Sequence, residues 1–164
     1  MPTNRYPPDT AEKGQALGNF FSTIGAPPKA AGKIPPYVKE VEKLNPSIKA
    51  WAIVGFCWGG KVVSLVNSSS ETQFNAGAEC HPAMVDPSDA LKIKIPLCML
   101  ASKDENPEEV KQFEANLTGP KHVEIFADQI HGWMAARSDL EDPRVKQEYE
   151  RGYKTLLEFF AKHV

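Results

Sequence analysis

Residues 51–60, Trp-Ala-Ile-Val-Gly-Phe-Cys-Trp-Gly-Gly, combine an apolar strand pattern with the glycine spacing of a sharp strand-to-helix turn. Trp51 to Val54 form a short apolar run of the kind that a buried strand carries. Cys57 follows, with glycines two residues before and two residues after it. These glycines prevent side-chain collisions at the turn, so the central side chain projects from the carboxyl end of the strand. Cys57 is therefore the candidate nucleophile.

The residues after Cys57 are predicted to form a helix that ends at Asn67-Ser-Ser-Ser. A helix N-terminus offers backbone N–H groups and the positive end of its dipole, which favour a thiolate and an oxyanion. The pattern is usually written with serine, and Gly-x-Cys-x-Gly also arises around a buried structural cysteine. Nucleophilic catalysis therefore requires a base and an orienting acid from elsewhere in the chain.

Length and composition set the broad class. With 164 residues the chain is predicted to form a single domain, residues 1–164, with a substantial core. A net charge of −2 gives no indication of a nucleic acid or a membrane as partner. Neither a secretion signal nor a membrane-spanning apolar run is predicted. The odd number of cysteines, without metal-ligand spacing, indicates reduced thiols and a cytoplasmic location.

Strand and helix patterns alternate along the chain. Further strands are predicted at residues 75–80, 95–101 and 122–126. Helices are predicted at residues 9–21, 35–45, 106–117 and 143–162, and residues 1–8 are predicted to be extended. Asp9 and Glu12 are expected to form a capping box, and Tyr37, Val41 and Leu44 to share one face of their helix. This alternation predicts a doubly wound, mostly parallel α/β sheet.

Four polar side chains follow the predicted strands: Cys57, His81, Asp104 and His131. Ligands bind at the carboxyl ends of strands in such sheets. Cysteine, aspartate and histidine stand here in the chain order nucleophile, acid, base that α/β hydrolases use. The base takes the thiol proton, and the acid holds the tautomer of the base. Glu105, next in sequence, also fits the role of the acid.

Several side chains near these strand ends leave an alternative role open. Asp128 competes with Asp104 and Glu105 for the role of the acid. His81 is expected either to touch substrate or to make a structural hydrogen bond. Trp58 and Trp133 are either walls of an acyl pocket or space-filling residues. The chain shows no metal-ligand cluster, phosphate-binding glycine loop or dinucleotide fingerprint, so no metal or other cofactor is implied.

Gly-Phe-Cys-Trp-Gly-Gly, His81-Pro82, Lys103-Asp104 and His131-Gly-Trp resemble motifs of dienelactone hydrolases, particularly the fungal members. The resemblance extends from about Tyr6 to the C-terminus. It implies an α/β-hydrolase fold and cleavage of a small ester or lactone through an acyl-thioester intermediate. It also implies a Cys57–Asp104–His131 triad, an oxyanion-hole N–H from Trp58, and Arg137 as the candidate for binding a substrate carboxylate.

The chain also departs from this family. Members carry further N-terminal strands, a second oxyanion-hole donor and, in bacterial enzymes, a glutamate that helps to form the thiolate. We find no counterpart before Cys57, so the chain is expected to be an N-terminally truncated member with an open sheet edge. Such an edge favours homo-oligomers. A non-catalytic binding or assembly module is the second candidate function, and a redox role for Cys57 is a third.

Overall fold

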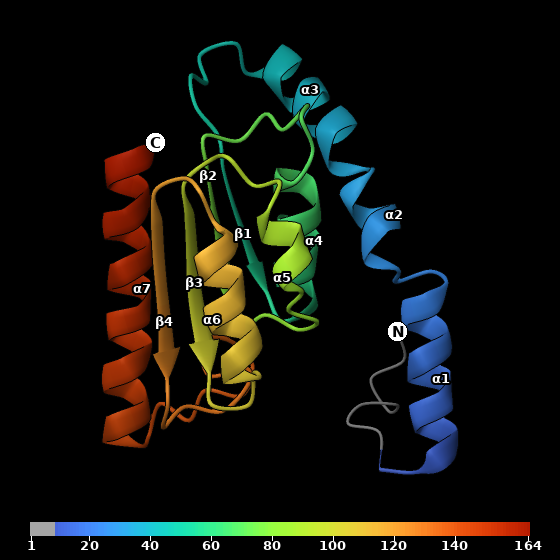
Figure 1. Cartoon of the computed structure of the whole chain (residues 1–164), viewed down its shortest axis with the longest axis vertical. Coiled ribbons are helices and arrows are strands. Elements are labelled where there is room, and N and C mark those ends of the chain that lie inside the picture. Colours follow the sequence, from blue (N-terminus) through green and yellow to red (C-terminus); the bar gives the residue numbers. More distant parts are fainter. Residues whose placement is uncertain (1–8) are drawn as a thin grey trace.

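Four parallel strands form the centre of the fold in the computed structural model, which describes residues 9–164. The strands are β1 (Ala52–Phe56), β2 (Ala76–Cys80), β3 (Leu97–Ser102) and β4 (Lys121–Phe126). They pair in that order, so their carboxyl ends share one edge of the sheet (Figure 1). The predicted parallel α/β sheet is confirmed. The extended conformation predicted for residues 1–8 lies outside the described residues.

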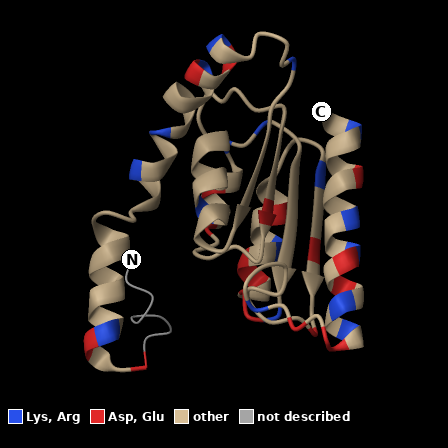
Figure 2. Ribbon diagram, turned by 180° about the vertical axis from the view of Figure 1, so that it is seen from behind, with Lys and Arg blue, Asp and Glu red and all other residues tan. Residues whose placement is uncertain are grey.

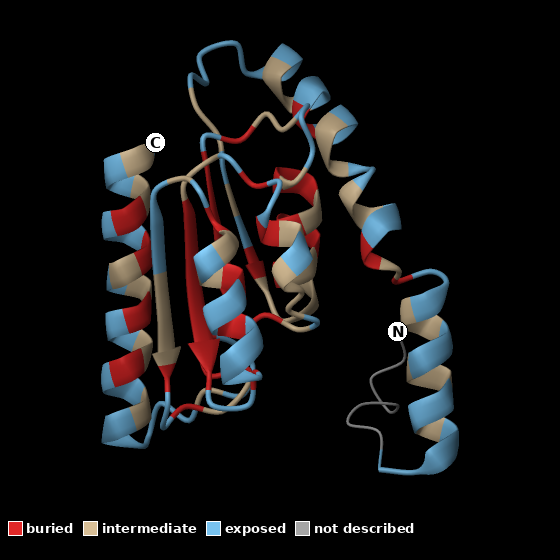
Figure 3. Cartoon of the chain, in the orientation of Figure 1, coloured by how far each residue is buried: buried red, intermediate tan, exposed pale blue. Residues whose placement is uncertain are grey.

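Helices cover both faces of the sheet. One face packs against α4 (Trp58–Asn67), α5 (Pro87–Ala90) and α6 (Pro107–Asn116), and the other against α7 (Pro143–His163). In β3, Leu97 and Met99 face the first group, whereas Cys98 and Leu100 face α7. Every residue of β3 is buried (Figure 3), which explains its unbroken apolar sequence.

The N-terminal helix α1 (Ala11–Ser22) stands apart from the sheet (Figure 1) and has no buried residue. Its cap differs from the prediction. The Thr10 hydroxyl accepts the Lys13 N–H at 3.2 Å, and Asp9 instead forms an ion pair with Lys13. Thr10 takes this role because it directly precedes the first helical residue.

Two further helices, α2 (Pro27–Ala31) and α3 (Ile34–Leu44), connect α1 to the sheet. Helix α3 does not bury the face that Tyr37, Val41 and Leu44 were predicted to share: Tyr37 is 71% exposed and Leu44 is 80% exposed. Val38 is buried instead, because α3 meets the body through Ile34 and Val38, which lie one turn apart. The sequence did not predict α2 and α5, because the prolines in their first turns resemble helix breaks.

Helix α7 is amphipathic. Glu148, Gly152, Leu156 and Phe159 are its buried residues, and charged side chains of both signs cover its outer side (Figure 2). A Cβ atom on Gly152 would lie 2.6 Å from the Trp133 ring, so glycine lets α7 approach the loop after β4 closely.

On the side of the sheet away from β4, β1 is an edge strand. The apolar Val54 on it is 44% exposed, because α7 packs against β2 and β3 and leaves this end uncovered. Self-association through this edge stays a prediction. Among residues 9–164, no helix combines the length and the apolar character that crossing a membrane requires.

We expect Gly152→Ala to destabilise the fold, although alanine is the better helix former. The new methyl group would overlap Trp133 and approach the Met134 sulfur at 3.0 Å. Overpacking of this kind costs about 1–3 kcal/mol. Urea unfolding should show a lower midpoint. Gly18→Ala in α1, where a Cβ would meet nothing within 4 Å, is the control and should not lower the midpoint. An unchanged midpoint for Gly152→Ala would contradict the close packing of α7.

Candidate active site

Cys57 lies at a strained turn between β1 and α4. Its backbone has φ 53° and ψ −119°, a conformation that residues other than glycine rarely adopt. Three backbone hydrogen bonds hold it: Cys57 donates to the Cys80 carbonyl at 3.1 Å, and its carbonyl accepts from Gly60 and Ala83, both at 2.9 Å. The predicted strand-to-helix turn is present, with the thiol at the N-terminus of α4.

Of the two glycines that flank Cys57 in the motif, only Gly55 prevents a collision as predicted. A Cβ on Gly55 would overlap the Gly59 backbone, which explains the first glycine. A Cβ on Gly59 itself would meet nothing within 4 Å. The close approach after the turn occurs at Gly60, where a Cβ would lie 2.7 Å from the Pro82 side chain. Gly60 therefore lets α4 pack against the segment that follows β2.

Residues with strained backbone conformations lie at the carboxyl ends of the strands. Among the described residues, the non-glycine positions with positive φ are Cys57, His81 and Met84, which follow β1 and β2. Gly132, after β4, has φ 93°. Strained backbone tends to occur at functional sites, where the surrounding structure maintains it. The strain thus marks the edge of the sheet where the candidate residues lie.

The His131 imidazole is held by Glu105. The distance from His131 Nδ1 to Glu105 Oε1 is 2.7 Å, and the second Glu105 oxygen accepts the Ser102 N–H. Asp104 has a different role, because its Oδ2 accepts the backbone N–H of His131 at 2.7 Å. The turn after β3 directs Glu105 inward and Asp104 toward the loop. Asp104, the acid that the resemblance implied, therefore contacts the His131 backbone and not its ring.

The third candidate acid lies elsewhere. Asp128 pairs with Arg144 at 2.6 Å and accepts a hydrogen bond from Gln129. Its side chain is about half exposed, at 47%. The Glu105 side chain is only 4% exposed, so its bond to His131 is the better shielded from water.

Electrostatics favour an ion pair between Cys57 and His131. A hydrogen bond from His131 lowers the pKa of the Cys57 thiol, and the Trp58 backbone N–H lowers it further. The thiolate and Glu105 raise the pKa of His131 to about 9. Burial is the largest influence on the other two thiols: it raises the pKa of Cys98 to about 12 and that of Cys80 still higher. Of the three thiols, Cys57 is therefore the one whose pKa is lowered.

His81 lies beneath the base. Its ring packs edge-on against His131 with centroids 5.0 Å apart, and also contacts Phe56. It is 1% exposed, and neither ring nitrogen has a hydrogen-bond partner among the described residues. Burial and the charge of His131 lower the pKa of His81 to about 4, so the ring is neutral near pH 7. The predicted substrate contact has no exposed surface here, and His81 instead supports the His131 ring.

Three other predicted residues occupy distinct places. Trp58 directs its backbone N–H toward the thiol, while its indole Nε1 donates to the Gly25 carbonyl at 2.7 Å. Trp133, a predicted substrate contact, is 0% exposed and packs on Phe126 in the core under α7. Arg137 donates from Nη1 to the His131 carbonyl at 3.0 Å, so its guanidinium holds the loop of the base.

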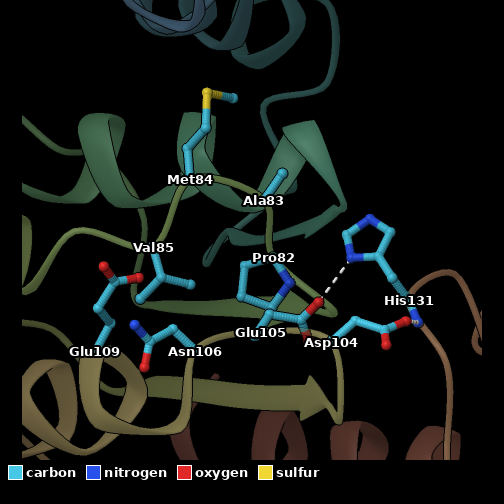
Figure 4. Close-up of a pocket in the computed structure, with 9 residues that line it drawn as sticks. All are labelled: Pro82, Ala83, Met84, Val85, Asp104, Glu105, Asn106, Glu109 and His131. Carbon is cyan, nitrogen blue, oxygen red and sulfur yellow. Dashed lines mark hydrogen bonds and ion pairs between the residues drawn. The ribbon is translucent and has the colours of Figure 1, made fainter. Parts of the chain in front are cut away.

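A cavity of about 280 Å³ opens beside His131. Figure 4 shows its lining, which comes from the segments after β2 and β3, the first turn of α6 and the histidine: Pro82, Ala83, Met84, Val85, Asp104, Glu105, Asn106, Glu109 and His131. The sequence did not single out Met84, Val85, Asn106 and Glu109. Their position after strand ends was the available signal. Among residues 9–164, no group of three or more His, Cys, Asp or Glu side chains is arranged to hold a metal ion.

The sequence profile of the dienelactone hydrolase family matches residues 5–164. The chain belongs to this family. It is 35% identical over 165 residues to the AIM2 family protein C30D10.14 of Schizosaccharomyces pombe, covering 98% of this chain and 66% of that protein. It is 32% identical over 117 residues to hydrolase pyvD of Aspergillus violaceofuscus, covering 68% of this chain and 46% of pyvD. The chain thus spans about two thirds, or less, of the length of these relatives.

A solved structure supports the fold. The dienelactone hydrolase-like promiscuous phosphotriesterase P91 from metagenomic libraries matches with a TM-score of 0.66 and 14% sequence identity. The match covers 94% of this chain and 69% of P91. This likeness confirms the predicted α/β-hydrolase-like fold.

We expect iodoacetamide to alkylate Cys57 in the folded protein at about pH 7, whereas the buried Cys80 and Cys98 stay unmodified. Because His131 lowers the pKa of Cys57, the rate should rise at a lower pH than for free cysteine. His131→Ala should move that rise upward and slow alkylation at neutral pH about tenfold. Mass spectrometry of quenched samples measures both effects. A wild-type profile like that of free cysteine would contradict the ion pair.

Proposed function

We propose that this chain is a hydrolase of small esters or lactones that uses Cys57 as nucleophile and forms an acyl-thioester. The observation that carries the proposal is the alignment of Cys57, His131 and Glu105. The thiol stands at the N-terminus of α4, and its lowered pKa comes first from His131. His131 is in turn bonded to the buried Glu105 at 2.7 Å. A nucleophile, its base and an orienting carboxylate are the parts that acyl transfer needs.

In the acylation half-reaction, the Cys57 thiolate attacks the carbonyl carbon and forms a C–S bond. The carbonyl electron pair moves to the oxygen, and the oxyanion accepts the Trp58 N–H. When the intermediate collapses, the C–O bond to the leaving group breaks. The His131 imidazolium gives its proton to the departing alkoxide. An acyl-thioester on Cys57, a neutral His131 and a free alcohol result; with a lactone, the alcohol stays attached to the acyl group.

In the deacylation half-reaction, neutral His131 removes a proton from water as the water attacks the thioester carbon. The second oxyanion again faces Trp58. Collapse breaks the C–S bond, releases the carboxylic acid and restores the thiolate beside the imidazolium. Glu105 stabilises the positive imidazole that exists before acylation and after water attack, and keeps Nε2 directed at the reacting atoms.

We further propose that Glu105 is the acid of the triad and that Asp104 positions the His131 backbone. Their contacts support this division, since Glu105 reaches the ring and Asp104 the backbone N–H. In this arrangement the negative charge of Glu105 matters for catalysis, whereas Asp104 contributes mainly as a hydrogen-bond acceptor.

The decisive test of hydrolysis compares the chain with Cys57→Ala on p-nitrophenyl acetate and on a dienelactone. We expect turnover in the wild type and a loss of at least about a thousandfold in the variant, because the nucleophile is gone. Circular dichroism should verify that both are folded. Equal release of p-nitrophenol by two folded proteins would overturn the proposed activity and leave a non-catalytic family member.

Isosteric amide substitutions at Glu105 and Asp104 test which carboxylate is the acid of the triad. Glu105→Gln removes the charge next to His131 and should lower kcat by about a hundredfold or more. Asp104→Asn keeps an oxygen that accepts the His131 N–H, so kcat should fall less than about tenfold. Steady-state kinetics near pH 7 measure both effects. The reverse ranking would assign the orienting role to Asp104, as the family resemblance implies.

A further inference from the structure

We propose that the cavity beside His131 selects esters or lactones that carry a positive charge over substrates that carry a carboxylate. This inference rests on the proposed function, because it names the substrate class of the same site. It departs from the substrate carboxylate that the family resemblance implies for Arg137.

The cavity has two chemically different walls. Pro82, Ala83, Met84 and Val85, from the segment after β2, form an apolar wall. The polar part of the lining combines carboxylates with one amide, and comes from the turn after β3 and the first turn of α6: Asp104, Glu105, Asn106 and Glu109 (Figure 4). Within the described part of the chain, no lysine or arginine contributes to the lining. An amphipathic ligand with a cationic end matches both walls.

The carboxylates differ in how far their charge is neutralised. Glu105 faces the imidazolium of His131, so these two charges offset each other. Among the described residues, Asp104 accepts only a backbone N–H and Glu109 forms no ion pair. The net charge that a ligand meets in the cavity is therefore negative.

Nearby cations do not reverse this sign. The Arg137 guanidinium is bonded to the His131 carbonyl and lies outside the lining. Lys61 pairs with Asp89 at 2.5 Å and with Asp86 at 3.6 Å. The first turn of α6 neutralises the positive end of the helix dipole. The Asn106 side chain accepts the Glu108 N–H, and Glu108 and Glu109 add negative charge. Glu109 would thus repel a substrate carboxylate, and the lining offers it no lysine or arginine from residues 9–164.

Three p-nitrophenyl esters of similar length provide the test: the neutral butyrate, the anionic hemisuccinate and the cationic 4-(trimethylammonio)butyrate. Each rate is divided by the hydroxide-catalysed rate of the same ester, which removes differences in intrinsic reactivity. We expect kcat/KM for the cationic ester to exceed that for the anionic ester by about tenfold or more. The ratio should shrink in about 0.5 M NaCl, because salt screens the field. An anionic ester cleaved as fast as the cationic one would overturn the inference, while turnover of the neutral ester would leave the proposed hydrolase intact.

Two neighbouring glutamates on α6 give a matched control. Glu109→Gln should reduce the cationic-to-anionic ratio about threefold, because it removes a charge from the lining. Glu108→Gln should not change the ratio, since Glu108 pairs with Lys111 at 2.9 Å and lies outside the lining. An equal effect of both variants would point to the overall charge of the protein and overturn the assignment to this cavity.

Alkylation of Cys57 tests the same charge without turnover. Iodoacetate is anionic and iodoacetamide is neutral, and the thiol that both alkylate is hydrogen-bonded to His131, which lines the cavity. We expect Glu109→Gln to raise the iodoacetate rate relative to the iodoacetamide rate, and Glu108→Gln to leave it unchanged. If neither variant changes this relative rate, the cavity does not sense charge. Absence of hydrolysis combined with the expected alkylation pattern would overturn the proposed function and retain the charge preference.

Discussion

The unfavourable backbone conformation of Cys57 is the constraint on which the site depends. A cysteine with positive φ persists because neighbouring elements hold it: the Cys80 carbonyl of β2 accepts its N–H, and Gly60 and Ala83 donate to its carbonyl. These bonds fix β1, β2 and α4 relative to one another. The loss of conformational freedom at this turn is offset by the pairing and packing of all three elements. The thiol therefore occupies a fixed place at the N-terminus of a helix.

The charges of the site follow from this placement. Cys57 faces His131 across the edge of the sheet, His131 faces the buried Glu105, and His81 packs under the base as a neutral ring. In a partly water-excluded site these groups act on each other more strongly than they would in water. The carboxylate stabilises the imidazolium and the imidazolium stabilises the thiolate, so removing one group changes the protonation of the others.

Patterns that reflect local physics were readable from the sequence. The apolar runs of β1 and β3, and the order of cysteine, acid and histidine after successive strands, led to the parallel sheet and to the residues at its carboxyl edge. The family resemblance favoured Asp104 over Glu105 as the acid, whereas Glu105 contacts the His131 ring, because adjacent carboxylates after one strand differ only in how the turn directs them. The buried face of α3 was not predicted, because the helix meets the body only around Val38. Helix α2 was missed because its first turn contains proline. For Trp133 the sequence left a pocket wall and a space-filling position open, and its complete burial favours the second.

Trp58 connects two parts of the molecule that are far apart along the chain. Its backbone N–H points toward the Cys57 thiol, whereas its indole ring donates to the Gly25 carbonyl in the connection between α1 and α2. The connection between α1 and α2 therefore contributes a hydrogen bond to the same residue whose backbone N–H lies beside the thiol, although α1 itself contributes no buried residue.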